Sequence, residues 1–305
     1  MGQYSFQAKD DKTINYYHWT PEAPKAILQI AHGMGEHAGR YAGLAEELGM
    51  HGYAVFAHDH RGHGQTASSA EDVGYFDHGG HFWEDTQNDL MMMTAIARKD
   101  HPGIPLFMMG HSMGSFLTRD YITNSSLQLQ GAILSGTAGD PGSLARVGRW
   151  LSGLISMIFG RGNRSEFLRK ISFGKYAASV KPMRTAADWL SREEAVVNAY
   201  IDDPRCGLTF TSGFWMDLLD GIQRINKSST YVNTPPELPI YLFAGESDPV
   251  GDYGKGVKDV YDLYKKVGVK DLTLKLYPGA RHETLNETNR DEVVADLIDW
   301  LDQHV

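Results

Sequence analysis

The sequence is poor in cysteine and contains no long apolar run. Cys206 is the only cysteine among the 305 residues, so no disulfide can form within the chain, which favours a reducing compartment. No apolar stretch approaches the roughly 18 to 20 residues that a membrane-spanning helix requires. The first residues, MGQYSFQAKDDK, are polar and differ from a secretory signal peptide. We therefore expect a cytoplasmic protein.

Positive charge is also scarce over most of the chain. There are 29 Lys and Arg against 38 Asp and Glu, which gives a net charge of −9. Nucleic-acid binding needs clustered cations that contact phosphates, so we expect no nucleic-acid partner. One segment differs, because residues 141–192 carry ten Lys and Arg against two acidic residues, a net +8 that leaves −17 on the rest. A basic block within an acidic chain predicts a separate module.

Short apolar runs alternate with longer amphipathic stretches. Continuous apolar runs of four to six residues are typical of strands that are buried on both faces, as in a parallel sheet. Such runs occupy residues 26–31, 53–57, 106–109, 131–134, 240–244 and 272–277. Residues 5–9 and 13–19 alternate in polarity and predict an edge hairpin, and helical periodicity marks residues 39–51, 81–99 and 291–304. The pattern predicts an α/β fold with a mostly parallel, eight-stranded sheet flanked by helices.

The alternation stops in the middle of the chain. No strand pattern is visible between about Thr137 and Pro236. A Pro-Gly pair lies near the start of this region, and the sequence Thr-Pro-Pro closes it. We predict a core domain formed by residues 1–136 and 237–305, interrupted by a helical cap of residues 137–236.

The stretch PLFMMGHSMG (105–114) runs from a predicted strand into a Gly-x-Ser-x-Gly motif. A helix-compatible run follows it, so the motif lies in the strand–turn–helix context that presents a nucleophilic serine. Gly110 and Gly114 would prevent collisions where the strand and the helix pass closely. We predict that Ser112 is the nucleophile. The alternative is a glycine-rich turn in which the serine has no role.

A serine hydroxyl needs a base and an acid that orients the base. In this topology both follow later strands, in the order serine, acid, histidine. Asp248 follows the strand at 240–244, and His282 follows the strand at 272–277 within PGARHE. Ser112, Asp248 and His282 therefore form the predicted triad. Glu246 is the alternative acid, and a purely structural role is the alternative for His282.

Acyl transfer also needs donors that stabilise the oxyanion. The backbone N–H of Met113 directly follows the predicted nucleophile. The N–H of Met34 lies in the glycine-rich loop HGMGEH after the strand at 26–31, where glycines let the backbone approach a substrate. We predict these two donors, with a plain turn as the alternative for the loop.

Two motifs suggest a bound group, but neither is complete. His58, His60 and His63 are spaced like the metal ligands of metallo-β-lactamases, yet Gly62 stands where that motif has Asp. The glycines at 33 and 35 lack the third glycine of a dinucleotide-binding fingerprint. We predict neither a metal nor a cofactor.

Together the motifs resemble one family. HGMGEHAGRY (32–41), DHRGHG (59–64), GHSMG (110–114), SDP (247–249) and GARHE (279–283) are similar to the monoacylglycerol lipase and lysophospholipase group of the α/β-hydrolase superfamily. The resemblance implies an α/β-hydrolase fold. It also implies a serine carboxylic-ester hydrolase that cleaves medium- or long-chain monoacyl lipids through an acyl-enzyme, with a small amphiphilic ester as its partner. Glu36, Arg40 and His111 would help to organise the pocket for the polar head group.

The predicted cap contains an uncharged run, WLSGLISMIFG (150–160), with arginines on both sides. The run is too short to span a bilayer, but it suits an interface or an acyl-binding tunnel. The candidate substrate contacts in it are Trp150, Leu151, Leu154, Ile155, Ile158 and Phe159. We also predict peripheral contact of the basic cap with a membrane or micelle. Ordinary packing of a cap helix and a solvated, neutralised set of arginines are the alternatives.

Two other functions stay open. A cap-bearing serine peptidase of the prolyl-iminopeptidase kind would need acidic residues in the cap to hold a substrate amine, whereas the first half of this cap is basic. A catalytically silent hydrolase-fold binding protein is the second. Such proteins usually lack a triad residue, and all three are present here.

Overall fold

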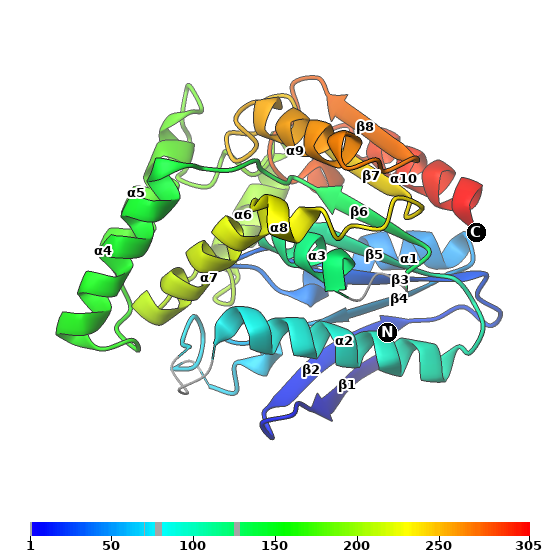
Figure 1. Cartoon of the computed structure of the whole chain (residues 1–305), viewed down its shortest axis with the longest axis horizontal. Helices are drawn as coiled ribbons and strands as arrows, with labels where there is room; N and C mark the ends of the chain where they lie inside the picture. Colours follow the sequence, from blue (N-terminus) through cyan, green and yellow to red (C-terminus); the bar gives the residue numbers. More distant parts are fainter. Residues whose placement is uncertain (1, 70, 77–80, 125–128) are drawn as a thin grey trace.

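A single mixed sheet forms the centre of the chain in a computed structural model that describes residues 2–69, 71–76, 81–124 and 129–305 (Figure 1). The strand order is β1-β2-β4-β3-β5-β6-β7-β8. Strands β1 (Gly2–Gln7) and β2 (Thr13–Trp19) form an antiparallel hairpin at one edge, and β2 also pairs antiparallel with β4. The remaining neighbours pair in parallel. The eight-stranded, mostly parallel sheet predicted from the sequence is thus confirmed.

The six parallel strands begin where the apolar runs begin and end at most two residues beyond them. They are β3 (Ala26–Ala31), β4 (Tyr53–His58), β5 (Leu106–His111), β6 (Gly131–Ser135), β7 (Ile240–Gly245) and β8 (Leu272–Tyr277). Two expectations were wrong. The first strand is Gly2–Gln7 and not 5–9, because Ala8 and Lys12 already close the turn of the hairpin. Strand β8 is only partly buried up to Tyr277, because it is the last strand and has one free edge.

Helices cover both faces of the sheet. On one face, α1 (Ala42–Met50) and α10 (Arg290–His304) share an apolar cluster with the strands, and the short helix η1 (Ala38–Tyr41) precedes α1. On the other face lie α2 (Phe82–Asp100), α3 (Met113–Asn124) and α9 (Lys255–Lys266). The three helical segments predicted at 39–51, 81–99 and 291–304 correspond to η1 with α1, to α2 and to α10. The short helices η2 (Gly64–Thr66) and η4 (Thr284–Asn286) lie in loops.

Between β6 and β7 the chain leaves the sheet and forms five helices, which we call the β6–β7 insertion (residues 136–239). They are α4 (Ser143–Phe159), α5 (Glu166–Ala178), α6 (Glu194–Asp202), α7 (Ser212–Ile225) and α8 (Ser228–Tyr231). All of its residues are described, and its only β pairing is an isolated bridge between Arg164 and Thr211. Figure 1 shows α4 and α5 at one end of the molecule, with α7 between α4 and the sheet.

Parallel pairing places the carboxyl ends of β3, β5, β7 and β8 at one edge of the sheet. The loops after these strands carry the predicted oxyanion donor, nucleophile, acid and base. The fold therefore brings residues from four distant parts of the sequence to one place. Across the described residues, no helix is both long enough and apolar enough to cross a membrane.

Candidate active site

Ser112 lies in a sharp turn between β5 and α3. Its φ is +52°, a left-handed conformation that is strained for any residue with a side chain. The turn is close because two glycines permit it: a Cβ on Gly110 would overlap the carbonyl of Gly114, and a Cβ on Gly114 would overlap that of Ala31. The backbone N–H of Ser112 donates to the Ser135 carbonyl at 2.9 Å, which fixes the turn against β6. The side chain of Ser112 is thereby held at the end of the strand, partly exposed.

His282 and Asp248 form a buried pair. Nδ1 of His282 lies 2.9 Å from Oδ2 of Asp248, and both side chains are almost inaccessible to solvent. The other carboxylate oxygen of Asp248 accepts the N–H of Val250 at 2.8 Å. Burial disfavours a charged imidazole, but Asp248 outweighs it, with help from Glu283 and Glu36, and the pKa of His282 is raised. The alternative acid, Glu246, is exposed and has no hydrogen bond to His282.

His111, the residue before Ser112, contacts the ring of His282. Its ring centroid is 4.8 Å from that of His282, and its Nδ1 is 3.1 Å from the Ser135 hydroxyl. A Cβ added at Gly33 would lie 3.2 Å from His111 Cδ2 and 3.3 Å from Ser112 Cβ, so both side chains border the loop after β3. Burial, followed by the proximity of His282, lowers the pKa of His111 to about 4. His111 is therefore neutral near pH 7 and packs beside the pair without competing for its proton.

The two predicted oxyanion donors are available. Met113 is the first residue of α3, and Met34 lies in the loop after β3. In the part of the chain that the structure describes, the Met34 N–H donates to no protein acceptor, and the Met113 N–H donates to none outside α3. The loop around Met34 is held by the Gly33 N–H, which donates to Oε1 of Glu36 at 2.6 Å. A developing oxyanion requires two such N–H groups that point to one place, and this role of Met34 and Met113 stays a prediction.

Glu36 and Arg40 are largely occupied by contacts within the protein. Nη1 of Arg40 donates to Oε2 of Glu36 and to Oε1 of Glu283, each at 2.7 Å, and Nη2 donates to Oε2 of Glu283 at 2.7 Å. Burial alone would raise the pKa of both carboxyl groups, but Arg40 lowers it, so both are ionised. The head-group role implied by the resemblance is therefore indirect at most. Glu283, which nothing in the sequence singled out beyond its place in GARHE, belongs to this network.

The β6–β7 insertion is fastened to the loop that carries His282. The N–H groups of His282 and Glu283 donate to the carbonyls of Trp189 and Leu190, at 3.3 and 2.7 Å. Nη1 of Arg281 donates to the carbonyls at 188 and 191, and the Trp189 ring lies 5.1 Å from that of His282. Sequence analysis missed these contacts, because the segment around Trp189 lies in an aperiodic turn region far from His282 in the chain.

The histidine-rich loop after β4 is a structural turn. The His60 N–H donates to Nε2 of His32 at 2.9 Å, Nδ1 of His60 is 3.1 Å from Nε2 of His58, and Nδ1 of His63 is 2.9 Å from the Arg61 carbonyl. Most of the ring nitrogens are thus engaged within the loop and with its neighbours. Burial lowers the pKa of His58 to about 3 and that of His63 to about 4. These are therefore neutral, packed histidines.

The comparisons with known proteins agree with this geometry. A profile of the Hydrolase_4 family, described as "Serine aminopeptidase, S33", matches residues 22–289. The chain belongs to this family of α/β-hydrolases.

Its relatives within the α/β-hydrolases include lipases and an esterase. The monoglyceride lipase of Homo sapiens is 32% identical over 297 residues, which cover 94% of this chain and 86% of the relative. The monoacylglycerol lipase of Mycolicibacterium smegmatis is 29% identical over 312 residues, covering 99% and 98%. A solved structure, a thermostable carboxyl esterase from Bacillus coagulans in complex with glycerol, is 29% identical with a TM-score of 0.92, and the match covers 99% of this chain and 98% of that one. The resemblance inferred from the motifs is confirmed.

In this α/β-hydrolase, α4 separates the six candidate substrate contacts into two groups. Leu151 and Ile155 pack against an apolar cluster that also contains Met34 and Met113, and Leu154 is partly buried. Trp150, Ile158 and Phe159 are 65%, 60% and 67% exposed and face away from the cluster. The two groups differ in exposure because α4 packs against α7 with one face and turns the other face to solvent. A contact between any of the six and a substrate stays a prediction.

The arginines that flank this run are mostly paired within the hydrolase itself. Arg149 donates to Asp220 at 2.7 Å, Arg161 donates to Asp217 at 3.1 Å, and Arg164 donates to backbone carbonyls at 71 and 73. Asp217 and Asp220 belong to α7, so the charges of Arg149 and Arg161 are neutralised within the insertion, whereas Arg164 is bound by carbonyl oxygens.

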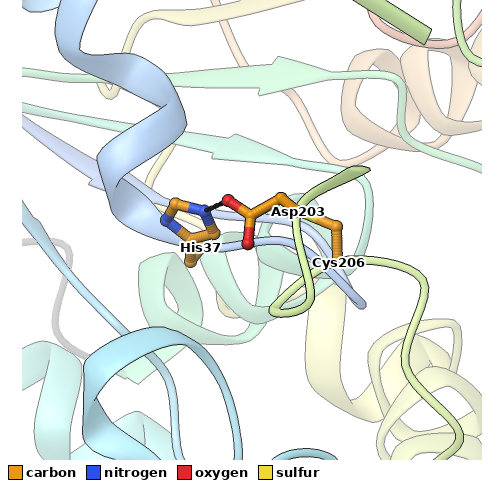
Figure 2. A group of neighbouring side chains, drawn as sticks. All are labelled: His37, Asp203 and Cys206. Carbon is orange, nitrogen blue, oxygen red and sulfur yellow. Dashed lines mark hydrogen bonds and ion pairs between the residues drawn. The ribbon is translucent and has the colours of Figure 1, made fainter. Parts of the chain in front are cut away.

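The single cysteine lies beside the loop after β3. Figure 2 shows His37 of this loop facing Asp203 and Cys206, which follow α6. Nε2 of His37 is 3.0 Å from Oδ2 of Asp203, but the same carboxylate also receives two hydrogen bonds from the Arg205 guanidinium. Burial raises the pKa of the Cys206 thiol to about 12, so the thiol is neutral. A carboxylate engaged by arginine and a neutral thiol are poor metal ligands, and we interpret the cluster as a contact between the insertion and the core.

Proposed function

We propose that the protein is a serine carboxylic-ester hydrolase that cleaves medium- or long-chain monoacyl lipids, monoacylglycerols or lysophospholipids, through an acyl-enzyme on Ser112. The observation that carries the proposal is the strained turn of Ser112 at the end of β5, at the same edge of the sheet as the buried His282–Asp248 pair. The names of the lipase and esterase relatives support it.

The proposed mechanism follows from the positions of these groups. The Ser112 hydroxyl attacks the ester carbonyl while its proton passes to Nε2 of His282. Asp248 keeps the other proton on Nδ1, orients the ring and stabilises the imidazolium. The N–H groups of Met34 and Met113 donate to the oxyanion. His282 then protonates the leaving alcohol, and a water molecule, activated in the same way, releases the fatty acid from Ser112.

We infer that residues 137–236 act as a cap over this site. Leu151, Ile155 and Met34 pack against one apolar cluster to which Met113 belongs, so we place a bound acyl chain between α4 and the proposed oxyanion donors. Each buried methylene contributes about 0.8 kcal/mol, which is enough to separate substrates by chain length. The outer face of α4 would contact a membrane or micelle. Because most flanking arginines are paired, apolar contact and not charge should dominate there.

An aminopeptidase activity is the second candidate, because the matching family carries that description. Such an activity needs an acidic group that is free to bind a substrate amine. Glu36 and Glu283 are both bound to Arg40, and the Asp188 carboxylate accepts from the N–H groups of Arg184 and Thr185. These carboxylates are already satisfied, which favours the ester.

The proposal is tested by a substrate panel. Wild type and Ser112→Ala are assayed against monoacylglycerols of increasing chain length, lysophospholipids, p-nitrophenyl esters and aminoacyl anilides with a free amine. We expect hydrolysis of the monoacyl esters and a loss of several orders of magnitude, on the order of 10⁶-fold in kcat, in Ser112→Ala. Faster cleavage of the aminoacyl anilides than of any monoacyl ester would contradict the ester assignment and support the peptidase.

A further inference from the structure

Glu283 directly follows the proposed catalytic base, yet the reaction described above does not use it. Its side chain is 5% exposed, and its carboxylate forms two parallel hydrogen bonds with the Arg40 guanidinium, each 2.7 Å long. The Asn286 amide adds a third donor at 3.0 Å. A paired contact of this geometry fixes both partners in orientation as well as in distance. The hydrogen bonds of the Glu283 side chain therefore fix the position of the peptide bond that joins Glu283 to His282.

The same guanidinium reaches the oxyanion loop. Arg40 donates to Oε2 of Glu36 at 2.7 Å, and Oε1 of Glu36 accepts the Gly33 N–H at 2.6 Å and the Tyr41 hydroxyl at 2.9 Å. The Tyr200 ring of the insertion lies over the guanidinium, 5.1 Å away. Gly33 is the neighbour of Met34, so an unbroken run of short hydrogen bonds joins the residue after the base to the residue before an oxyanion donor.

This network carries one excess negative charge. Two ionised carboxylates share a single guanidinium, and they lie close enough to His282 to favour its charged form. The other titratable or charged groups around His282 are Asp248 after β7, His111 at the end of β5, Arg40 in η1 and, next to Asp248, Tyr176 in α5. Among these His111 is neutral, so the carboxylates and Arg40 set the local charge.

We propose that Glu283 is a positioning residue. Through Arg40 and Glu36 it holds the loop that carries His282 and the loop that carries Met34 in a fixed relative position. Its negative charge also favours the imidazolium that forms during acyl transfer. This inference rests on the proposed function. Glu283 is buried and bound to Arg40, and in the mechanism above it does not contact the substrate. Its loss should therefore lower kcat and leave KM nearly unchanged.

The test compares Glu283→Gln with a matched control, Asp89→Asn. Asp89 is also buried and also forms paired hydrogen bonds with an arginine, Arg61, at 2.7 and 3.0 Å, and Arg61 likewise binds a second carboxylate, that of Asp10. This second network belongs to the turn after β4 and lies outside the proposed site. Both variants lose one charge from a buried arginine pair, so both should lose stability to a similar degree.

With a soluble p-nitrophenyl ester, Glu283→Gln is expected to lower kcat by about 10- to 100-fold, because small displacements of catalytic groups have costs of this size. The acid limb of the pH–rate profile should move to lower pH, since removing a negative charge lowers the pKa of His282. Glu283→Asp keeps the charge but is shorter, so it should lower kcat and leave the acid limb in place. Asp89→Asn should retain the kcat and the pH profile of the wild type, per mole of folded protein.

Two outcomes would overturn the inference. One is a Glu283→Gln variant with wild-type kcat and an unmoved acid limb. The other is a loss of activity in both Glu283 variants that is no larger than their loss of folded protein, as measured by circular dichroism. That result would show that Glu283 contributes to folding and not to catalysis. Failure of the proposed function is distinguishable: there the wild type itself would hydrolyse no ester.

Discussion

At the scale of single residues, glycines determine how closely the loops of the site approach each other. Gly245 ends β7, three residues before Asp248, and a Cβ there would overlap the carbonyl oxygens of Ala280 and Arg281 in the His282 loop. We predict that Gly245→Ala forces these two loops apart and lowers kcat by about 10²-fold, because the acid and the base no longer meet at 2.9 Å.

Gly49→Ala is the control for Gly245→Ala. Gly49 lies in α1 with no atom within 4 Å of an added Cβ, so alanine there should keep kcat and raise the unfolding free energy by about 0.5 to 1 kcal/mol. Both variants are compared by steady-state kinetics and by urea denaturation. Equal kcat values for the two variants would show that Gly245 does not set the distance between the loops.

The sequence contained most of the information for the proposed reacting residues and little for those that hold them in place. Ser112, Asp248 and His282 could be predicted because a strand end and a glycine motif mark each position along the chain. The pairing of Arg40 with Glu283 could not, because the two residues are separated by 243 positions and each is an ordinary polar residue in its local pattern. Trp189 was missed for the same reason.

At the scale of elements, α4 presents apolar side chains to solvent as well as to the protein. Leu144, Val147, Trp150, Met157, Ile158 and Phe159 are all more than half exposed. Exposed apolar patches of this kind mark contact surfaces in many proteins. We predict that changing Trp150, Ile158 and Phe159 together to serine abolishes most of the association with lipid vesicles, while hydrolysis of a soluble short-chain ester stays within about twofold of the wild type.

Co-sedimentation with vesicles measures this association, and Met50→Ser is the control. Met50 is 81% exposed but lies at the end of α1, away from the insertion, so its loss should leave vesicle binding unchanged. Because most arginines near the run are paired, binding should weaken only modestly between low and high salt. Unchanged binding by the triple serine variant would show that α4 does not contact the lipid.

The elements of the sheet could be predicted because both faces of the inner strands are buried, and burial makes a continuous apolar run. The same reasoning overestimated the burial of β8, which is the outermost strand and has one free edge. It also could not separate the two faces of α4. The small and polar residues Ala145, Ser152 and Ser156 lie on the face toward α7, whereas many large apolar residues of the helix are exposed, so polarity alone assigns the outer side wrongly.

At the scale of the whole molecule, a cluster of buried, neutral histidines should make the fold sensitive to acid. His32, His58, His60 and His63 are fully buried, and burial lowers the pKa of each, to about 3 for His58 and about 4 for His63. Unfolded histidine titrates near pH 6.5. Below that value the unfolded chain therefore binds protons that the folded chain does not, and the unfolding free energy falls by about 1.4 kcal/mol per histidine per pH unit down to about pH 4.

Urea denaturation at pH 7.5, 6.5 and 5.5 measures this effect. The unfolding free energy should fall by about 0.35 kcal/mol per histidine between the first two values and by about 1 kcal/mol per histidine toward the third. His63→Phe should reduce the slope of the unfolding free energy against pH by about one quarter, because it removes one of the four histidines. The substitution should be tolerated, since the His63 ring already lies 4.9 Å from Phe210. A flat profile between pH 7.5 and 5.5 would contradict the assignment of neutral, buried histidines.

The central claim is that Ser112 is the nucleophile and that His282 activates it. The most direct measurement is to treat the protein with a fluorophosphonate and to locate the adduct by peptide mass spectrometry. We predict one adduct per chain, on Ser112, with no labelling of Ser112→Ala and strongly slowed labelling of His282→Ala. An adduct on another residue, or undiminished labelling of Ser112→Ala, would contradict the account.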